Sequence, residues 1–241
     1  MAYQPLTADL TVLVPAAGME LLAFSDRPGP YQLLGDAFLL DVTLERLARA
    51  LPDASFCVVV HPRDRWWLRS RSAARSRFQA CKGGDTRLES VRAGLAGLRV
   101  RDDDPVLVHD VARPCVTGME VHRLVAEACD REEGGVLATP VRDTVSQADA
   151  SGRVLTTLDQ GRVWRVLAPQ IFPYGVLCRA LDRVLERGLS VADEGACVEA
   201  LGLQPRVVRG SDDNIRVLHK GDLALADWIL RRQHRAGDSV A

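Results

Sequence analysis

The sequence has very little lysine, no long apolar run and no excess of positive charge. Only Lys82 and Lys220 are lysines among the 31 basic residues, which we attribute to a bias toward arginine along the whole chain. No stretch reaches the about 18 consecutive apolar residues typical of a transmembrane helix. The 31 basic and 32 acidic residues give a net charge of −1, whereas a protein that binds nucleic acid by charge alone is strongly basic. We therefore expect no membrane segment and no nucleic-acid partner.

Closely spaced metal-binding residues are also lacking. None of the six cysteines stands two or three residues from another, and the five histidines are scattered. This spacing disfavours a zinc ribbon and a thioredoxin-like pair. Residues 1–10 show no signal-peptide pattern. We expect a cytoplasmic protein with reduced, mostly buried thiols, because disulfides are rare in the cytosol.

Short apolar runs alternate with helical patterns along the chain. Residues 10–15, 55–60 and 105–109 have the length and β-branched composition of strands that are buried on both faces. Helical spacing of apolar residues follows at 86–98, with Asp85 or Thr86 as N-cap, and again before Gly188 and at 223–230. The alternation predicts a single α/β domain over residues 1–241, with a mostly parallel sheet and helices on both faces.

Residues 141–158 break this alternation. A polar turn at 148–152 separates two segments of β character. We predict that they form a β-hairpin arm that projects from the main sheet.

Residues able to bind phosphate follow three of the predicted strands. In an open parallel sheet the ligand crevice lies beyond the carboxyl ends of the strands, and there the chain has PAAG at 15–18, GGD at 83–85 and HDVARP at 109–114. Small residues let a phosphate approach backbone N–H groups, Asp110 could bind magnesium and Arg113 a phosphate. Each motif alone is commonly a turn, an N-cap or a local ion pair, and only their shared position after successive strands favours a binding site. The chain has neither a Walker lysine nor a Gly-x-Gly-x-x-Gly motif, which disfavours a P-loop NTPase and a dinucleotide dehydrogenase.

Eight motifs between residues 10 and 232 together resemble one enzyme family. They are VPAAG at 14–18, GGDTRLESVRAGL at 83–95, VLVHDVARPCV at 106–116, PVRDTV at 140–145, TTLDQGRVWRVLAPQIF at 156–172, ADEGACVEALG at 192–202, DDNIRV at 212–217 and DLALADWIL at 222–230. In this order they resemble the 2-C-methyl-D-erythritol 4-phosphate cytidylyltransferases of non-mevalonate isoprenoid biosynthesis. The resemblance implies a Rossmann-like nucleotidyltransferase fold, CTP and a sugar-alcohol phosphate as substrates, and Mg2+ as cofactor. It also implies a homodimer in which the hairpin arm reaches the other subunit.

The resemblance also implies roles for individual residues. The nucleotide-binding positions of the family match Ala16, Ala17, Gly18, Gly84, Asp85 and Ser90. Asp110 matches the metal-binding aspartate, Arg113 matches an arginine of the active site, and Arg216 stands where the family has a lysine.

The chain departs from the family pattern in the loop after Gly18. Glu20 stands at a family glycine, Leu22 at an arginine and Gly29 at a lysine, so two cations that hold the triphosphate are missing. Arg27, the only basic residue in the sequence between Gly18 and Tyr31, is the candidate replacement and a candidate catalytic residue.

A second departure concerns the substrate side. Gln160 stands at a family arginine, and Ala168 and Ala192 stand at two threonines of the substrate pocket; Arg162 could replace the lost arginine. Two main interpretations therefore stay open: a working cytidylyltransferase with a rewired loop, or a catalytically impaired or repurposed member that binds a nucleotide or a protein partner. A transferase for another sugar phosphate is a third.

Overall fold

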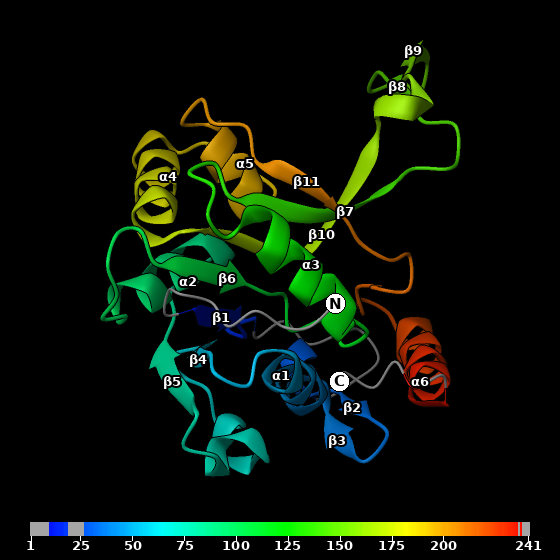
Figure 1. Ribbon diagram of the computed structural model, residues 1–241. Coiled ribbons are helices and arrows are strands. Elements are labelled where there is room, and N and C mark those ends of the chain that lie inside the picture. The colour runs from blue at the N-terminus through cyan, green and yellow to red at the C-terminus, as the bar shows by residue number, and fades with distance from the viewer. Residues whose placement is uncertain (1–9, 19–26, 236, 238–241) are drawn as a thin grey trace.

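A seven-stranded sheet forms the centre of the fold, in the order β11-β7-β10-β6-β1-β4-β5 (Figure 1). The computed structural model describes residues 10–18, 27–235 and 237. Neighbouring strands run parallel except at β10, which is antiparallel to β6 and β7. The strands are β1 (Thr11–Pro15), β4 (Ser55–Val60), β5 (Phe78–Lys82), β6 (Pro105–Val108), β7 (Gly135–Pro140), β10 (Trp164–Pro173) and β11 (Arg206–Arg209). The predicted mostly parallel sheet is confirmed.

Helices cover both faces of this sheet. The helices are α1 (Leu39–Ala50), α2 (Arg87–Ala96), α3 (Gly118–Ala128), α4 (Tyr174–Arg187), α5 (Glu194–Glu199) and α6 (Lys220–Arg235). Val12 and Val14 of β1 share an apolar cluster with α1 and α3, whereas Leu13 shares one with α2, α4 and α5. Neighbouring residues divide in this way because successive side chains of a strand point to opposite faces. Helix α6 packs in a third cluster with the start of α1.

Two helix ends form as the sequence predicts. Helix α2 begins at a capping box, in which the Thr86 hydroxyl accepts a hydrogen bond from the Glu89 N–H at 3.2 Å and the Glu89 carboxylate accepts one from the Thr86 N–H at 2.8 Å. Helix α4 ends at Gly188, whose φ of 60° is in the left-handed region. These ends place the GGD motif immediately before α2.

The predicted arm is present as a separate two-stranded sheet. It consists of β8 (Ser146–Ala148) and β9 (Val154–Thr157), which pair antiparallel and project from the body of the molecule (Figure 1). Every residue of both strands is exposed, including Val154 at 65% and Leu155 at 62%. The arm therefore leaves apolar side chains uncovered in a single chain.

The remaining elements are short. They are β2 (Leu33–Leu34), β3 (Ala37–Phe38), η1 (Gly29–Tyr31), η2 (Trp67–Arg69), η3 (Ser72–Ala74) and η4 (Gln160–Arg162). All six cysteines carry free thiols, and the Sγ atoms of Cys57 and Cys81 lie 3.3 Å apart. Among the described residues, no helix combines the length and the apolar character that crossing a bilayer would require.

Candidate functional site

The three candidate motifs leave the sheet at one edge, where β6, β1, β4 and β5 end. Ala16 N–H donates to the Val59 carbonyl at 2.7 Å, Gly83 N–H to the Val60 carbonyl at 2.8 Å, and His109 N–H to the Leu13 carbonyl at 3.0 Å. Each bond continues the pattern of a parallel ladder by one step, so each motif starts where its strand stops. Ala16, Ala17 and Gly18 thus begin at the same sheet edge as the GGD and HDVARP motifs.

The GGD loop packs so closely on α2 that it needs glycine. A Cβ atom on Gly83 would lie 2.6 Å from Ser90 Oγ, and one on Gly84 would lie 2.5 Å from Glu89 Cβ. The Ser90 hydroxyl accepts from the Gly84 N–H and donates to the Gly84 carbonyl, both at 3.2 Å. Ser90 is buried, so in this structure its hydroxyl holds the loop in shape, whereas Gly84 is half-buried and Asp85 is exposed.

Asp110 lies buried just beyond β6 and keeps its charge. Its Oδ1 accepts the Ala112 N–H at 3.0 Å, and its Oδ2 pairs with Arg216 Nε at 2.9 Å. Burial raises the pKa of this carboxyl, but the guanidinium groups of Arg87 and Arg216 outweigh burial and hold the pKa below its ordinary value. Asp110 is therefore an ionised carboxylate surrounded by positive charge.

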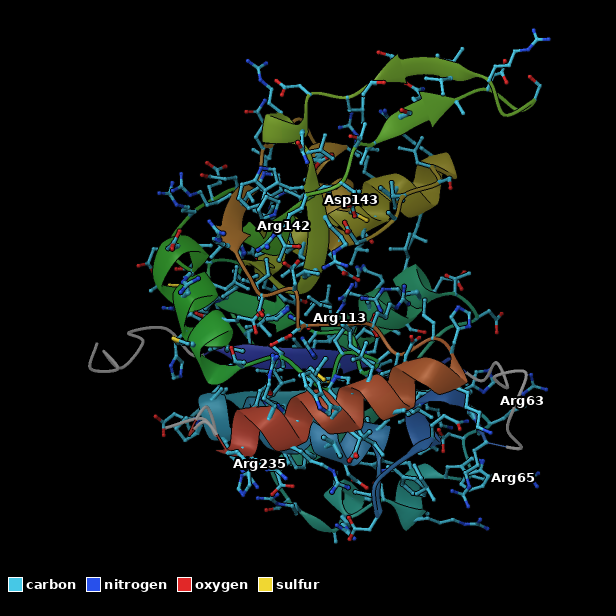
Figure 2. The ribbon with its side chains drawn as sticks, turned by 90° about the vertical axis from the view of Figure 1, so that its right-hand side faces the viewer. Arg63, Arg65, Arg113, Arg142, Asp143 and Arg235 are labelled. Atoms are coloured by element: carbon cyan, nitrogen blue, oxygen red, sulfur yellow. The ribbon has the colours of Figure 1, made fainter. Side chains whose placement is uncertain are left out.

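Arg113 joins the HDVARP motif to the DDNIRV motif. Its Nη1 donates to the Asn214 carbonyl at 2.6 Å, and the Val217 N–H donates to the Ala112 carbonyl at 2.8 Å. Burial lowers the pKa of the Arg113 guanidinium, the carboxylate of Asp110 opposes this effect, and the charge of Arg216 adds to it. Figure 2 shows Arg113 near the middle of the molecule, whereas Arg142 and Asp143 lie toward the arm. The structure thus brings together Asp110, Arg113 and Arg216, which lie far apart in the sequence.

Arg87, which was not among the predicted site residues, also belongs to this group. Arg87 opens α2, and its Nη2 lies 3.2 Å from Oε1 of the buried Glu194. Burial lowers its pKa, but the carboxylates of Glu194 and Asp110 outweigh burial and raise the pKa above its ordinary value. The available signal was its position two residues after the GGD motif, at the first turn of a helix.

The structure describes only part of the loop after Gly18, in which two cations of the family pattern are missing. Glu20 and Leu22 lie outside the described residues. Gly29 opens η1, and the guanidinium carbon of Arg27 lies 5.9 Å from the centre of the Trp66 ring, the geometry of a cation–π contact. Arg27 thus lies against an aromatic group, and its catalytic role remains a prediction.

The substitutions on the substrate side lie at the arm, in β10 and before α5. Gln160 is exposed in η4, where its side chain donates to the Arg142 carbonyl, and Arg162 pairs with Asp159 at 3.4 Å. Ala168 is buried in β10 and Ala192 is exposed before α5. The two alanines add no polar group to the site.

A cavity of about 600 Å³ lies beside the site rather than in it. It is lined by residues from the start of α3, the ends of β7 and β11, the 210–213 segment and α6, among them Glu120, Ser211 and Arg232. None of the predicted site residues lines it.

Comparison with known proteins decides the family. The family model described as IspD, 2-C-methyl-D-erythritol 4-phosphate cytidylyltransferase, matches residues 10–232. The chain belongs to this family. A cytidylyltransferase of this name from Hahella chejuensis is 37% identical over 92% of the chain and 93% of its own length. One from Dechloromonas aromatica is 41% identical over 91% and 96%.

Solved structures agree with this assignment. The chain superposes on a 4-diphosphocytidyl-2C-methyl-D-erythritol synthase with a TM-score of 0.80 and 31% identity, over 94% of this chain and 100% of the other. It superposes on the Francisella tularensis IspD with a TM-score of 0.78 and 30% identity, over 92% and 100%. The predicted family and the predicted nucleotidyltransferase fold are confirmed, and the protein is a nucleotidyltransferase of the IspD family.

Proposed function

We propose that the protein transfers CMP from CTP to 2-C-methyl-D-erythritol 4-phosphate and releases pyrophosphate, as a step of non-mevalonate isoprenoid biosynthesis. Membership of the IspD family over residues 10–232 carries this proposal. The convergence of Asp110, Arg113 and Arg216 beyond β6 supports it, because a polyanionic substrate needs concentrated positive charge.

The reaction places few chemical demands on the protein. A phosphate oxygen of the sugar-alcohol phosphate attacks the α-phosphorus of CTP, and the bond to the β,γ-pyrophosphate breaks as the new phosphoanhydride bond forms. Negative charge moves onto the leaving pyrophosphate, so catalysis consists of holding the two substrates in line and stabilising that charge. We assign the holding of phosphates to Arg113, Arg216 and Arg27, and the nucleotide cradle to residues 16–18 and to Gly84, Asp85 and Ser90.

Asp110 is the residue that would hold Mg2+. Its carboxylate is ionised in a buried setting, which suits a hard cation. Magnesium is often held by one or two carboxylates together with substrate phosphates, so one aspartate beside a phosphate site fits this ion. When bound, Mg2+ would neutralise part of the phosphate charge.

We extend the proposal to assembly and location. A homodimer would cover the exposed apolar residues of the arm, among them Val154 and Leu155. The free state of all six cysteines fits a cytoplasmic protein. The net charge of −1 fits small anionic substrates better than a nucleic-acid partner.

Release of pyrophosphate from CTP tests the proposed function. We expect Mg2+-dependent release only when methylerythritol phosphate is also present. A set of other sugar-alcohol phosphates serves as the specificity control, and preferred use of one of these would replace the proposed substrate. The second candidate function is that of a catalytically impaired or repurposed family member, and Gly29, which stands where the family has a lysine, is the reason to test it. Binding of CTP without release under any of these conditions would indicate an impaired or repurposed family member.

A further inference from the structure

One buried residue, through its side chain and its backbone carbonyl, connects three segments of the site. Asn214 is completely buried, and its Nδ2 donates to the Ala168 carbonyl of β10 at 2.8 Å and to Glu120 Oε1 of α3 at 3.4 Å. Its backbone carbonyl accepts the hydrogen bond from Arg113 at 2.6 Å. Asn214 therefore touches the strand, the helix and the arginine that surround the predicted phosphate site.

Glu120 anchors this arrangement to the start of α3. The side chain is buried, and its Oε1 also accepts the Ser211 N–H at 2.8 Å. Its Oε2 accepts both the N–H and the hydroxyl of Thr117, each at 2.9 Å. Because Thr117 caps the helix, the 211–214 segment is tied to a rigid element rather than to another loop.

The other end of the same segment carries Arg216. Arg216 follows Asn214 by two residues, and its Nε lies 2.9 Å from Oδ2 of Asp110. The next residue, Val217, donates its N–H to the Ala112 carbonyl. The Arg216 side chain is 48% exposed, so packing alone does not hold it. Its direction depends on where the backbone of residues 211–217 lies.

We propose that Asn214, held by Glu120, is a positioning residue that sets Arg113 and Arg216 against Asp110 for phosphate transfer. The inference rests on the proposed function for its catalytic part. Asparagine suits this position because the two groups that face its Nδ2, a carbonyl and a carboxylate, are both acceptors. An aspartate of the same shape would place an oxygen against them.

The main variant is Asn214→Asp. It preserves side-chain volume but loses the donor and leaves two buried acceptors facing an oxygen. We expect kcat for pyrophosphate release to fall about tenfold to hundredfold at saturating substrates, from the loss of these buried contacts. In the ligand-free protein, hydrogen–deuterium exchange of the 211–217 peptide should speed up about tenfold, while a peptide from the centre of α4 should not change.

The matched control is Gln233→Glu. Gln233 is also a buried amide, and its Nε2 donates to the Cys115 carbonyl at 3.0 Å, a bond that Gln233→Glu loses. Its Oε1 accepts from Arg46 Nη2 at 2.6 Å, and the new carboxylate keeps this contact. We therefore expect Gln233→Glu to lower Tm less than Asn214→Asp does and to keep kcat within about twofold. Equal losses of kcat in both variants would show a merely structural role and overturn the proposal.

Two other results also test the positioning role of Asn214. If Asn214→Asp does not fold, Glu120→Gln carries the test with the same measurements, because it turns one anchoring acceptor into a donor. If the wild type makes no product, the proposed function fails, and the exchange of the 211–217 peptide alone decides the positioning role. Unchanged exchange in the folded variant would overturn it.

Discussion

Three guanidinium groups and two carboxylates meet beyond β6. Arg87 pairs with Glu194, Arg216 pairs with Asp110, and Arg113 bonds to a backbone carbonyl. The ion pairs leave the charge of Arg113 uncompensated within this group. Clustered charged groups with shifted pKa values are a feature of functional sites, and under the proposed function the triphosphate of CTP brings the opposite charge to Arg113.

Asp110→Asn tests the carboxylate at the centre of this group. The substitution should weaken binding of CTP in the presence of Mg2+ about tenfold or more, because the cation loses its charged ligand. Binding of CTP in excess chelator should change little. Calorimetric titration with and without Mg2+ measures both, and Asp103→Asn, at an exposed carboxylate beside Arg101, is the control. Equal Mg2+-dependent affinity for CTP in Asp110→Asn and the wild type would show that Asp110 does not bind the metal ion.

Restoring charge to the loop after Gly18 should raise the rate. Leu22→Arg and Gly29→Lys return two phosphate ligands, and Glu20→Gly removes an opposing charge. A Cβ atom added at Gly29 meets no atom within 4 Å among the described residues. Each charged hydrogen bond contributes about 1.5–3 kcal/mol, so together the two should raise kcat/KM by roughly two to four powers of ten. The gains should exceed additivity, because all three positions act on one triphosphate.

Arg27→Ala is the converse of this experiment. If Arg27 has replaced the missing cations, its removal abolishes the activity of the wild type. A wild type that turns over at an ordinary rate and is insensitive to Arg27→Ala would show that the loop is not deficient and that an arginine elsewhere does its work. Steady-state pyrophosphate release decides between these outcomes.

At the scale of elements, the GGD loop and α2 act as one unit. The capping box at Thr86 starts the helix, and Ser90 in its first turns holds Gly84 through two hydrogen bonds. The Thr86 cap and the Ser90 hydroxyl together fix the conformation of the loop that we propose binds the nucleotide.

Gly84→Ala should disrupt this unit. The new Cβ would lie 2.5 Å from Glu89 Cβ, too close for either backbone to stay in place. We expect CTP affinity to fall about tenfold, from the displaced loop, with a loss of about 1–3 kcal/mol in unfolding free energy. Gly97→Ala, at the other end of the same helix, is the control, since its Cβ would meet an atom only at 3.5 Å. Denaturant unfolding and CTP titration of both variants measure the two effects. Equal CTP affinity in Gly84→Ala and the wild type would show that the GGD loop does not bind the nucleotide.

Elements were more predictable than their arrangement. Strands with continuous apolar runs, the cap at Thr86, the stop at Gly188 and the hairpin all have local signals, and the structure confirms them. The antiparallel direction of β10 has no local sequence signal, because a buried strand shows the same apolar pattern in either direction. Asp110 and Arg113 were predicted from their place after a strand and from the family resemblance, and Arg216 from the resemblance alone. Arg87 and Asn214 lie in the same motifs, but the ion pair of Arg87 with Glu194 and the buried bonds of Asn214 are tertiary contacts that the sequence does not show.

The whole molecule has a feature that a single chain does not explain. The arm extends from the body with both strands exposed, and its apolar residues have no cover within the described chain (Figure 1). An isolated two-stranded hairpin is only marginally stable in water. Both facts favour an assembly in which a second copy covers the arm.

We therefore expect sedimentation at micromolar concentration to show a dimer with twice the chain mass of 26.3 kDa. Val154→Asp with Leu155→Asp should weaken dimerisation about hundredfold or more, because two apolar side chains that become buried contribute about 1.5–3 kcal/mol each. Tm measured on the monomer should hardly change, since both side chains are exposed there. Ser146→Asp with Gln147→Asp adds the same charge to the other strand without removing apolar surface, and it should remain a dimer. A wild type that sediments near 26.3 kDa would refute the dimer. Equal dissociation of both double variants would show that charge on the arm, rather than the loss of its apolar side chains, governs assembly.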